Sequence, residues 1–377
     1  MKKEALLSKV VPKLSPNSLE VVKKRYLQTD LEGNPVETPA EMFYRVAEYM
    51  AEAEDLYPTK RNKEEVAEEF YKLMAELRYL PGGRVLFAAH KDTFNQLHSC
   101  YVLPIDDSMQ SIFDCLKEAS IVHQYNGGTG FNFSKIRPKG DRVKNIPGVA
   151  FGPVKVVEIF SDTLGKILQG GKRSGANMGI LNVDHPDIYD FIHMKDSGSK
   201  IFNFNVSVGV TDKFMKAVEE DGDHELVNPR NGEVVKRVRA RELFQEICEN
   251  AWRCADPGMI FLDGLERRNP TPALDLQNAT NPCGEQPLLP YESCNIGSII
   301  LSNHVKNGEV DFDTLRESVR SAVHMMDNNI DVNHYPLKKI EERVRFGNRR
   351  IGLGVLGFGQ MLYRLGIPYN STEGVKL

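Results

Sequence analysis

Hydrophobic positions in the first 90 residues recur at the spacing of amphipathic helices. Within residues 41–57 and 63–80, two sets of apolar side chains would each share one helical face: Met42, Phe43, Val46, Met50 and Ala53, and then Val66, Phe70, Leu73, Met74 and Leu77. Pro81-Gly82-Gly83 interrupts this pattern. The sequence therefore predicts a helical N-terminal region over residues 1–90.

After residue 90, the pattern changes to strands that alternate with helices. The clearest strand has apolar side chains at every second position, namely Phe202, Phe204, Val206, Val208 and Val210. Thr211 or Asp212 would cap the helix that follows. Two further helices are predicted with inward sets Leu243, Phe244, Ile247, Cys248 and Ala251, and Leu315, Val319, Val323 and Met326. Repeated strand–helix units indicate an α/β fold with a largely parallel sheet, either open or closed into a barrel.

Composition and charge exclude several classes of protein. Of the 377 residues, 41% are hydrophobic and 27% are charged, and the net charge of −4 offers no general attraction for nucleic acid or an anionic membrane. No apolar run is long enough to span a membrane, and the N-terminus does not read as a signal peptide, so a cytoplasmic location is expected. The six cysteines have neither CxxC nor zinc-ligand spacing, so no metal site is expected. We interpret Cys115, Cys248 and Cys254 as small core residues.

The remaining cysteines lie near polar side chains that suit radical chemistry. Asn281, Cys283 and Glu285 occupy alternate positions, so an extended segment would place all three side chains on one face. Cys294 follows in the same run, and Cys100 lies far upstream. A thiol can exchange a hydrogen atom with carbon, and a neighbouring carboxylate can move a proton. The alternative is a loop with buried structural thiols.

This segment resembles the active site of ribonucleotide reductase large chains, most closely the adenosylcobalamin-dependent class II form. The resemblance extends to LHSCYVLPIDDSMQSI, NGGTGFNFSKIRP, GGKRSGANMGILNVDHPDI and NRRIGLGVLGFGQML. It implies that Cys283 forms a thiyl radical in a closed pocket and that Glu285 is a general base. Asn281 would hold the ribose hydroxyls. Cys100 and Cys294 would supply two electrons and form a disulfide, which a thioredoxin-like protein or another dithiol reduces.

The resemblance also implies an architecture and further binding residues. The fold would be an N-terminal helical region followed by a ten-stranded α/β barrel of two parallel five-stranded halves, with a central finger loop that carries Cys283. Residues 1–90 would form the helical region. Residues 91–377 would hold the first half, the finger loop and the start of the second half. The C-terminal portion of the reductase would be absent, so we expect little activity from this chain alone.

Two glycine-rich segments are expected to bind a deoxynucleoside triphosphate or ATP effector. Gly127-Gly128-Thr129-Gly130 would be a flexible first loop, followed by two cations, and a second loop spans residues 169–175. By resemblance, a homodimer would form around these loops. The effector residues would be Asp107, Ser108, Ile112, Lys135, Arg137, Gln169 and Arg173. For the first segment the alternative is a plain turn followed by two solvated cations, and for the second it is an ordinary surface loop.

The substrate would be a ribonucleotide, with diphosphates favoured over triphosphates. Ser99 would contact the ribose together with Asn281 and Glu285. Many relatives have PNSPT before this strand, whereas this chain has Pro81-Gly82-Gly83-Arg84-Val85, so Arg84 is the candidate for the phosphate.

Three other functions stay open at this point. A class I large chain would take its radical from a separate metal-containing subunit. A non-catalytic half would bind nucleotides without turnover. A nicotinamide oxidoreductase would use Gly352, Gly354 and Gly357, but this pattern needs a complete βαβ unit and an acid, for which Glu373 is the candidate. We interpret these glycines as sites of tight strand–helix packing.

Overall fold

The computed structural model describes residues 3–58, 61–89, 95–143, 148–169, 173–196 and 201–377. It divides into two compact units. The first comprises residues 1–98, 295–335 and 345–377, and the second comprises residues 99–294 and 336–344. The division into domains at residue 90 stays a prediction.

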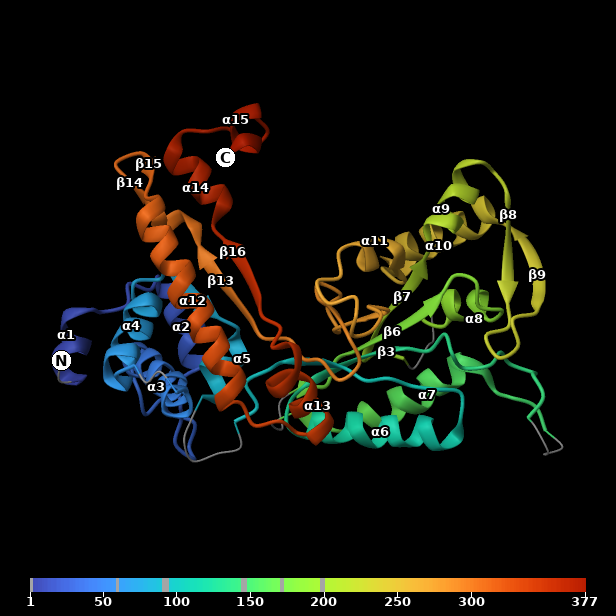
Figure 1. Ribbon diagram of the computed structural model, residues 1–377, viewed down its shortest axis with the longest axis horizontal. Helices are drawn as coiled ribbons and strands as arrows, with labels where there is room; N and C mark the ends of the chain where they lie inside the picture. Colours follow the sequence, from blue (N-terminus) through green and yellow to red (C-terminus); the bar gives the residue numbers. More distant parts are fainter. Residues whose placement is uncertain (1–2, 59–60, 90–94, 144–147, 170–172, 197–200) are drawn as a thin grey trace. The chain divides into compact units, whose positions relative to one another are not determined.

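The first unit is mainly helical, as its sequence predicts. Its helices and strands are α1 (Lys3–Lys9), α2 (Pro16–Arg25), α3 (Pro39–Ala51), η1 (Glu52–Leu56), α4 (Lys63–Ala75), β1 (Tyr79–Pro81), α5 (Gly83–Ala88), β13 (Ile296–Ile300), η2 (Leu301–His304), β14 (Val305–Lys306), β15 (Glu309–Val310), α12 (Phe312–Val332), η3 (Val344–Asn348, which begins one residue before this unit), β16 (Gly352–Leu356), α14 (Phe358–Leu365) and α15 (Thr372–Lys376). The long helix α12 packs against α3 and α4 (Figure 1). In α3 and α4, the predicted apolar faces are buried from Met42 to Met50 and from Val66 to Met74.

The predicted inward face of α12 is partly wrong. Val319 and Val323 are 36% and 39% exposed, whereas Ser318, Ala322 and Met325 are buried with Met326. The buried stripe therefore lies beside the predicted one. It includes Ser318, which is hydrogen-bonded to His304 and is for that reason tolerated in the core.

A small sheet in the first unit holds the glycine pattern near the C-terminus. β13 pairs with β1 antiparallel and with β16 parallel. Gly357 has a φ of +71°, and a side chain there would crowd Ser302 at 2.9 Å. Glu373 lies in the short helix α15 and not at the end of a strand. These positions support tight packing between a strand and a helix as the reason for the glycines.

The second unit is an α/β structure around a five-stranded parallel sheet of order β10-β7-β6-β3-β2. Its elements are β2 (Cys100–Val102), α6 (Met109–Gln124), β3 (Gly128–Asn132), α7 (Gly152–Leu164), β4 (Leu168–Gln169), β5 (Arg173–Ser174), β6 (Asn177–Asn182), α8 (Ile188–His193), β7 (Phe204–Val210), α9 (Asp212–Glu219), β8 (Asp223–Val227), β9 (Val234–Arg239), α10 (Ala240–Cys254), β10 (Gly258–Phe261), α11 (Leu262–Arg267), β11 (Ala279–Thr280), β12 (Pro287–Leu288) and α13 (Lys338–Arg343). Within the described residues this sheet is open, with β2 and β10 as its edges.

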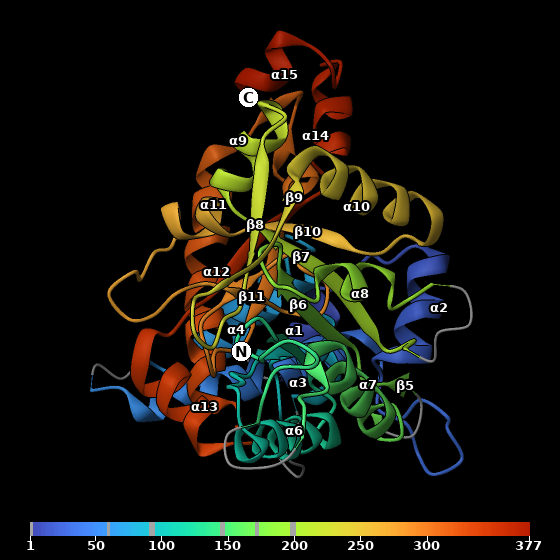
Figure 2. The ribbon, with the colours of Figure 1, turned by 90° about the vertical axis from the view of Figure 1, so that its right-hand side faces the viewer.

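Helices cover the sheet, as the strand–helix pattern predicts. Helices α6 and α7 run side by side (Figure 1), and the β8–β9 hairpin lies beside α9 and α10 (Figure 2). Thr211 caps α9 by accepting a hydrogen bond from the backbone N–H of Phe214 at 3.2 Å, which confirms that prediction.

Two sequence predictions fail in these elements. Phe202 lies before β7 and is 74% exposed, because the strand begins at Phe204. Cys248 is exposed on α10, where Asn250 is buried instead and donates hydrogen bonds to the carbonyls of Ile192 and Asp256. Cys115 is buried, as predicted.

Candidate active site

The segment with Asn281, Cys283 and Glu285 forms the tip of a β-hairpin. Its two arms are β11 and β12, in which Ala279 pairs with Leu288. The backbone N–H of Gly284 donates to the carbonyl of Asn281 at 3.0 Å, and Gly284 has a φ of +80°, so the chain turns here. The prediction of an extended segment with three side chains on one face is therefore wrong. Asn281 is buried, whereas Cys283 and Glu285 are exposed.

The hairpin lies directly against strand β3, and the glycines of that strand make this approach possible. A Cβ atom at Gly130 would collide with the carbonyl oxygen of Thr280, and one at Gly128 would lie 2.8 Å from Cγ of Pro282. Asn132 donates to the carbonyl of Asn278 at 2.6 Å, which fixes the base of the hairpin. The expectation of a flexible loop at residues 127–130 is thus corrected, whereas the effector role of this segment stays a prediction. These residues enter a buried strand, and two of its glycines admit the hairpin backbone.

Cys100 and Cys294 lie side by side as free cysteines. Cys100 begins β2, and the backbone N–H of Cys294 donates to its carbonyl at 2.9 Å. The pKa of the Cys100 thiol is raised, first by its hydrogen bond with the Cys294 thiol and then by burial. The charge of Glu285 acts in the same direction, and the Asn281 amide opposes it. Four of the five predicted catalytic residues therefore lie close together: Cys100 interacts through a hydrogen bond or a charge with Cys294, Asn281 and Glu285.

Asn281 has a buried donor that suits a ligand. Its side-chain oxygen accepts from the backbone N–H of Gln286 at 3.0 Å. Its Nδ2 is buried, and no partner among the described residues meets hydrogen-bond geometry with it. Buried polar atoms are nearly always satisfied, so this donor is a natural contact for a hydroxyl group of a bound ligand.

Cys283 is not enclosed within the described residues. Its side chain is exposed at the turn of the hairpin, next to Gly284. The expectation of a closed pocket around Cys283 is therefore not met by this chain. The exposed thiol is accessible from outside the hairpin, and its radical role stays a prediction.

The two further substrate candidates, Ser99 and Arg84, each make a hydrogen bond. The carbonyl of Ser99, next to Cys100, accepts from the backbone N–H of Gly128 at 2.8 Å. Arg84 lies on α5 in the other unit, where its Nε donates to the carbonyl of Gln96 at 2.9 Å. Both roles in substrate binding stay predictions.

The predicted effector cations are paired with neighbouring acids. Arg137 donates to Asp107 from its Nε at 2.8 Å and from its backbone N–H at 3.1 Å. Lys135 pairs with Asp106 at 2.7 Å. An anionic ligand that binds here must compete with these carboxylates or share the cations with them.

Two of the other effector candidates, Ser108 and Ile112, have structural roles in helix α6. The side chains of the remaining two lie outside the part of the chain that the structure describes. Ser108 caps α6 by accepting from the backbone N–H of Ser111, and Ile112 is buried in that helix. Gln169 and Arg173 are opposite each other in the β4–β5 pair. Their side chains, and residues 170–172 between them, lie outside the described part of the chain.

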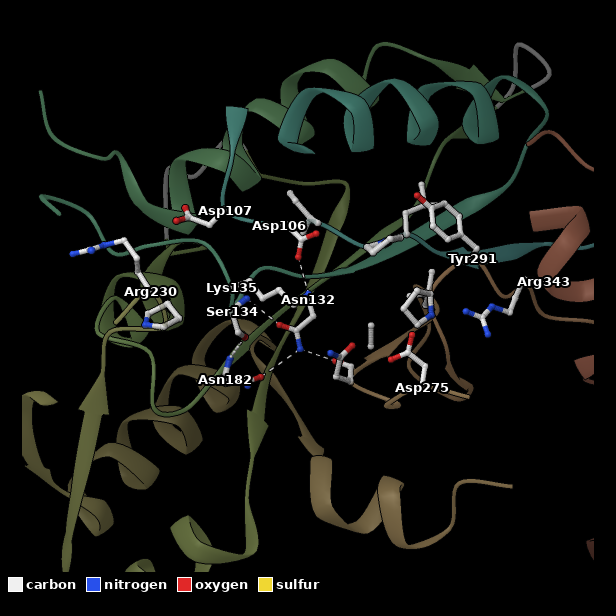
Figure 3. A pocket seen from close by; sticks show the side chains of 18 residues that line it. Asp106, Asp107, Asn132, Ser134, Lys135, Asn182, Arg230, Asp275, Tyr291 and Arg343 are labelled. Carbon is white, nitrogen blue, oxygen red and sulfur yellow. Dashed lines mark hydrogen bonds and ion pairs between the residues drawn. The ribbon is translucent and has the colours of Figure 1, made fainter. Parts of the chain in front are cut away.

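A cavity of about 730 Å³ lies at the carboxyl ends of β2, β3 and β6, where ligands often bind in parallel sheets (Figure 3). It is lined at the base of the hairpin by Asn278 and Ala279, and not at the tip that carries Cys283. Its polar lining includes residues that sequence analysis did not single out, among them Arg230, Tyr291 and Arg343. Arg230 lies between β8 and β9 and Arg343 lies on α13, and neither belongs to a recognisable motif. Tyr291 lies in the run between Glu285 and Cys294, so the cysteine motif could have pointed to it.

Among the described residues, no group of three or more His, Cys, Asp and Glu side chains is arranged to hold a metal ion. Likewise, none of the helices in this part of the chain combines the length and the apolarity needed to cross a membrane.

Comparisons with known proteins agree with these features. The family model of the ribonucleotide reductase barrel domain matches residues 98–377, and that of the all-alpha domain matches residues 12–93. A vitamin B12-dependent ribonucleoside-diphosphate reductase of Thermoplasma acidophilum is 43% identical over 97% of this chain and 55% of its own length. A protein with the same name from Mycobacterium tuberculosis is 46% identical over 97% of this chain and 52% of its own length.

A more distant relative has a different name. The ribonucleoside-diphosphate reductase subunit alpha of Chlamydia muridarum is 30% identical over 93% of this chain and 36% of its own length. The chain spans about half the length of the two B12-dependent relatives. Because the barrel-domain model covers most of its residues, this chain belongs to the ribonucleotide reductase large-chain family.

Proposed function

We propose that this chain is the N-terminal part of an adenosylcobalamin-dependent ribonucleotide reductase, which reduces ribonucleoside diphosphates to 2′-deoxyribonucleotides. The observation that carries this proposal is the adjacent pair of thiols, Cys100 and Cys294, beside the buried amide of Asn281. The hairpin that holds Asn281 also presents Cys283 and Glu285. The names of the relatives support both the diphosphate substrate and the cobalamin.

The described residues suit a radical source that approaches from outside the chain. Cys283 is exposed at a turn, where a large cofactor can reach its sulfur. When bound, adenosylcobalamin supplies the radical that oxidises this thiol. We propose that the C-terminal portion found in the relatives completes a ten-stranded barrel and encloses the hairpin tip.

Each side chain then has a distinct step in the proposed reaction. The Cys283 sulfur removes the hydrogen atom from C3′, while Glu285 takes the 3′-hydroxyl proton as a general base. The Asn281 amide orients the ribose hydroxyls. The 2′-hydroxyl leaves as water, and the two thiols of Cys100 and Cys294 supply two electrons and two protons as their disulfide forms. The hydrogen atom returns to C3′, and an external dithiol reduces the disulfide by exchange.

The remaining parts of the proposal concern regulation and assembly. A deoxynucleoside triphosphate or ATP would bind near Asp107, Ser108, Ile112, Lys135 and Arg137, with Gln169 and Arg173 in the second loop. Ser99 and Arg84 would contact the substrate ribose and phosphate. We further propose a homodimer around the effector loops, a thioredoxin-like reductant and a cytoplasmic location.

The experiment combines this chain with the C-terminal portion that its relatives carry, together with adenosylcobalamin, a dithiol and a ribonucleoside diphosphate. Deoxynucleotide formation without any metal-containing subunit is expected. A requirement for such a subunit would favour the class I alternative. Deoxynucleotide binding without any product would favour a non-catalytic half.

Matched cysteine variants test the mechanism. Cys283→Ala should abolish product formation. Cys248→Ala is the control, because Cys248 is also exposed and lies on α10 away from the hairpin. Product formed by Cys283→Ala would contradict the proposed radical role.

A further inference from the structure

A three-residue cluster holds the segment that leads to Cys294. The Tyr291 hydroxyl donates to Oε2 of Glu118 at 3.0 Å. Nζ of Lys339 donates to Oε1 of Glu118 at 2.8 Å and to the Tyr291 hydroxyl oxygen at 3.1 Å. The Lys339 ammonium also lies 5.0 Å from the centroid of the Tyr291 ring. These contacts join three parts of the chain that are distant in the sequence: helix α6, helix α13 and the segment that follows β12.

The charges in this cluster reinforce one another. The Glu118 side chain is only 16% exposed, so its pairing with Lys339 is partly shielded from solvent. The pKa of Lys339 is raised, chiefly by its hydrogen bond to Glu118. The Tyr291 hydroxyl therefore has charged partners on two sides, and hydrogen bonds to charged groups are stronger than neutral ones.

Tyr291 also has an unusual backbone conformation. Its φ is +64°, in the left-handed region that residues with a side chain seldom adopt. Such a conformation persists only where the surroundings hold it. The contacts of the Tyr291 ring and hydroxyl are suited to that task.

The backbone from Tyr291 to Cys294 pairs with the backbone of residues 100–102, which places Cys294 next to Cys100. The N–H of Tyr291 donates to the carbonyl of Val102 at 2.9 Å, and the N–H of Val102 donates to the carbonyl of Glu292 at 3.2 Å. The N–H of Cys294 then donates to the carbonyl of Cys100 at 2.9 Å. In a paired segment, a slip by one residue turns every side chain to the opposite face. The turn at Tyr291 therefore determines whether the Cys294 thiol faces Cys100.

We propose that Tyr291, Glu118 and Lys339 act as a positioning clamp that aligns the Cys294 thiol with the Cys100 thiol. The clamp does not touch the reacting atoms. It raises the effective concentration of one thiol relative to the other, and therefore favours their disulfide. This inference rests on the proposed function in one respect, namely that Cys100 and Cys294 are a redox pair.

The equilibrium with an external dithiol measures this alignment directly. When oxidised dithiothreitol is reduced, the two thiols of the chain lose two protons and two electrons, and one S–S bond forms. The dithiothreitol disulfide accepts those electrons and protons and opens. Because the external couple is the same for every variant, a change in the equilibrium constant reports a change within the chain.

The test compares variants of the 377-residue chain at equilibrium with oxidised and reduced dithiothreitol. Free thiols are trapped by alkylation, and the disulfide-linked peptides of Cys100 and Cys294 are quantified by mass spectrometry. Tyr291→Phe removes only the hydroxyl and is expected to lower the equilibrium constant by about tenfold. Lys339→Met should lower it by a similar or smaller factor.

Lys338→Met is the matched control. Lys338 is the neighbouring residue on α13, is 86% exposed and pairs with Glu342 at 3.6 Å, so its loss should leave the equilibrium constant unchanged. Unfolding of the reduced chain by urea is measured in parallel. If Tyr291→Phe changed the unfolding midpoint but not the thiol equilibrium, the cluster would be merely structural and the clamp would be refuted.

The possible failures are distinguishable. If the parent chain forms the disulfide and both clamp variants match it, the clamp is refuted while the redox pair stands. If the parent chain forms no disulfide between Cys100 and Cys294, the proposed function fails, and the clamp fails with it. Should Tyr291→Phe not fold, Lys339→Met decides the question, because Lys339 is 60% exposed and its loss leaves no cavity in the core.

Discussion

A single methyl group at Gly130 is expected to displace the hairpin that carries Cys283. In Gly130→Ala, the new Cβ would lie well inside the 3.0 Å limit that real Cβ atoms respect, and the atom it meets is the backbone carbonyl oxygen of Thr280. A backbone obstacle cannot rotate away as a side chain can. Overpacking of this kind costs about 3 kcal/mol at the upper end of its usual range, which exceeds the small gain of replacing a strand glycine by alanine.

Two related variants calibrate that prediction. Gly128→Ala meets Cγ of Pro282 at 2.8 Å and the carbonyl oxygen of Ala176 at 3.1 Å, so a smaller loss of about 1 kcal/mol is expected. Gly222→Ala is the control, because its nearest neighbours lie at 3.7 to 3.9 Å and no steric cost arises.

The assay is urea unfolding combined with the rate at which iodoacetamide labels Cys283. Gly130→Ala should lower the free energy of unfolding most among the three variants and should also change the labelling rate. If Gly130→Ala were as stable as Gly222→Ala and labelled Cys283 at the parent rate, the hairpin would not lie against β3 as described.

Three further predictions concern pH, effector binding and helix capping. Burial lowers the pKa of His123 from 6.5 to about 4, so the unfolded chain takes up a proton first as the pH falls. The contribution of His123 to the free energy of unfolding is complete above pH 6.5 and should decline by about 3 kcal/mol down to pH 4. In urea unfolding, the free energy of unfolding of His123→Gln should therefore depend less on pH. Arg137→Met should weaken binding of a deoxynucleoside triphosphate in equilibrium dialysis by about tenfold, and more than Lys135→Met does. The reason is that Arg137 holds the half-buried Asp107, whereas Lys135 is 64% exposed. If the two variants bound the nucleotide with equal affinity, the effector assignment would be contradicted. Thr211→Ala should cost about 1 kcal/mol of stability in thermal unfolding, and Thr211→Ser should retain it, since only the hydroxyl caps α9.

Local signals in the sequence were sufficient for most of the elements. The spacing of Val66, Phe70 and Met74 predicts a helix because one face of α4 must be buried, whatever covers it. The alternation from Phe204 to Val210 likewise predicts β7. The cysteine motif and its flanking segments predicted the family, because the chemistry constrains those residue types and their spacing.

The faces of the helices were less predictable. Cys248 and Asn250 lie two positions apart on α10, and polarity alone assigns the cysteine to the core. The structure buries Asn250, since two backbone carbonyls accept hydrogen bonds from its amide. Those acceptors belong to other segments, so the sequence of the helix does not contain the reason.

The sequence by itself determined where helices and strands form and which residues can carry the chemistry, since both depend on neighbours along the chain. Only the tertiary structure decided that the chain turns between Asn281 and Gln286. It also showed that Gly130 lies in a strand that contacts the backbone of this hairpin, and not in a flexible loop. The family resemblance had paired Cys294 with Cys100, but only the tertiary structure shows the backbone hydrogen bond that joins them. The physical reason is that the contact of Gly130 with the hairpin and the approach of Cys294 to Cys100 depend on backbone contacts between segments well over a hundred residues apart. No local periodicity records which distant carbonyl or amide a residue will meet.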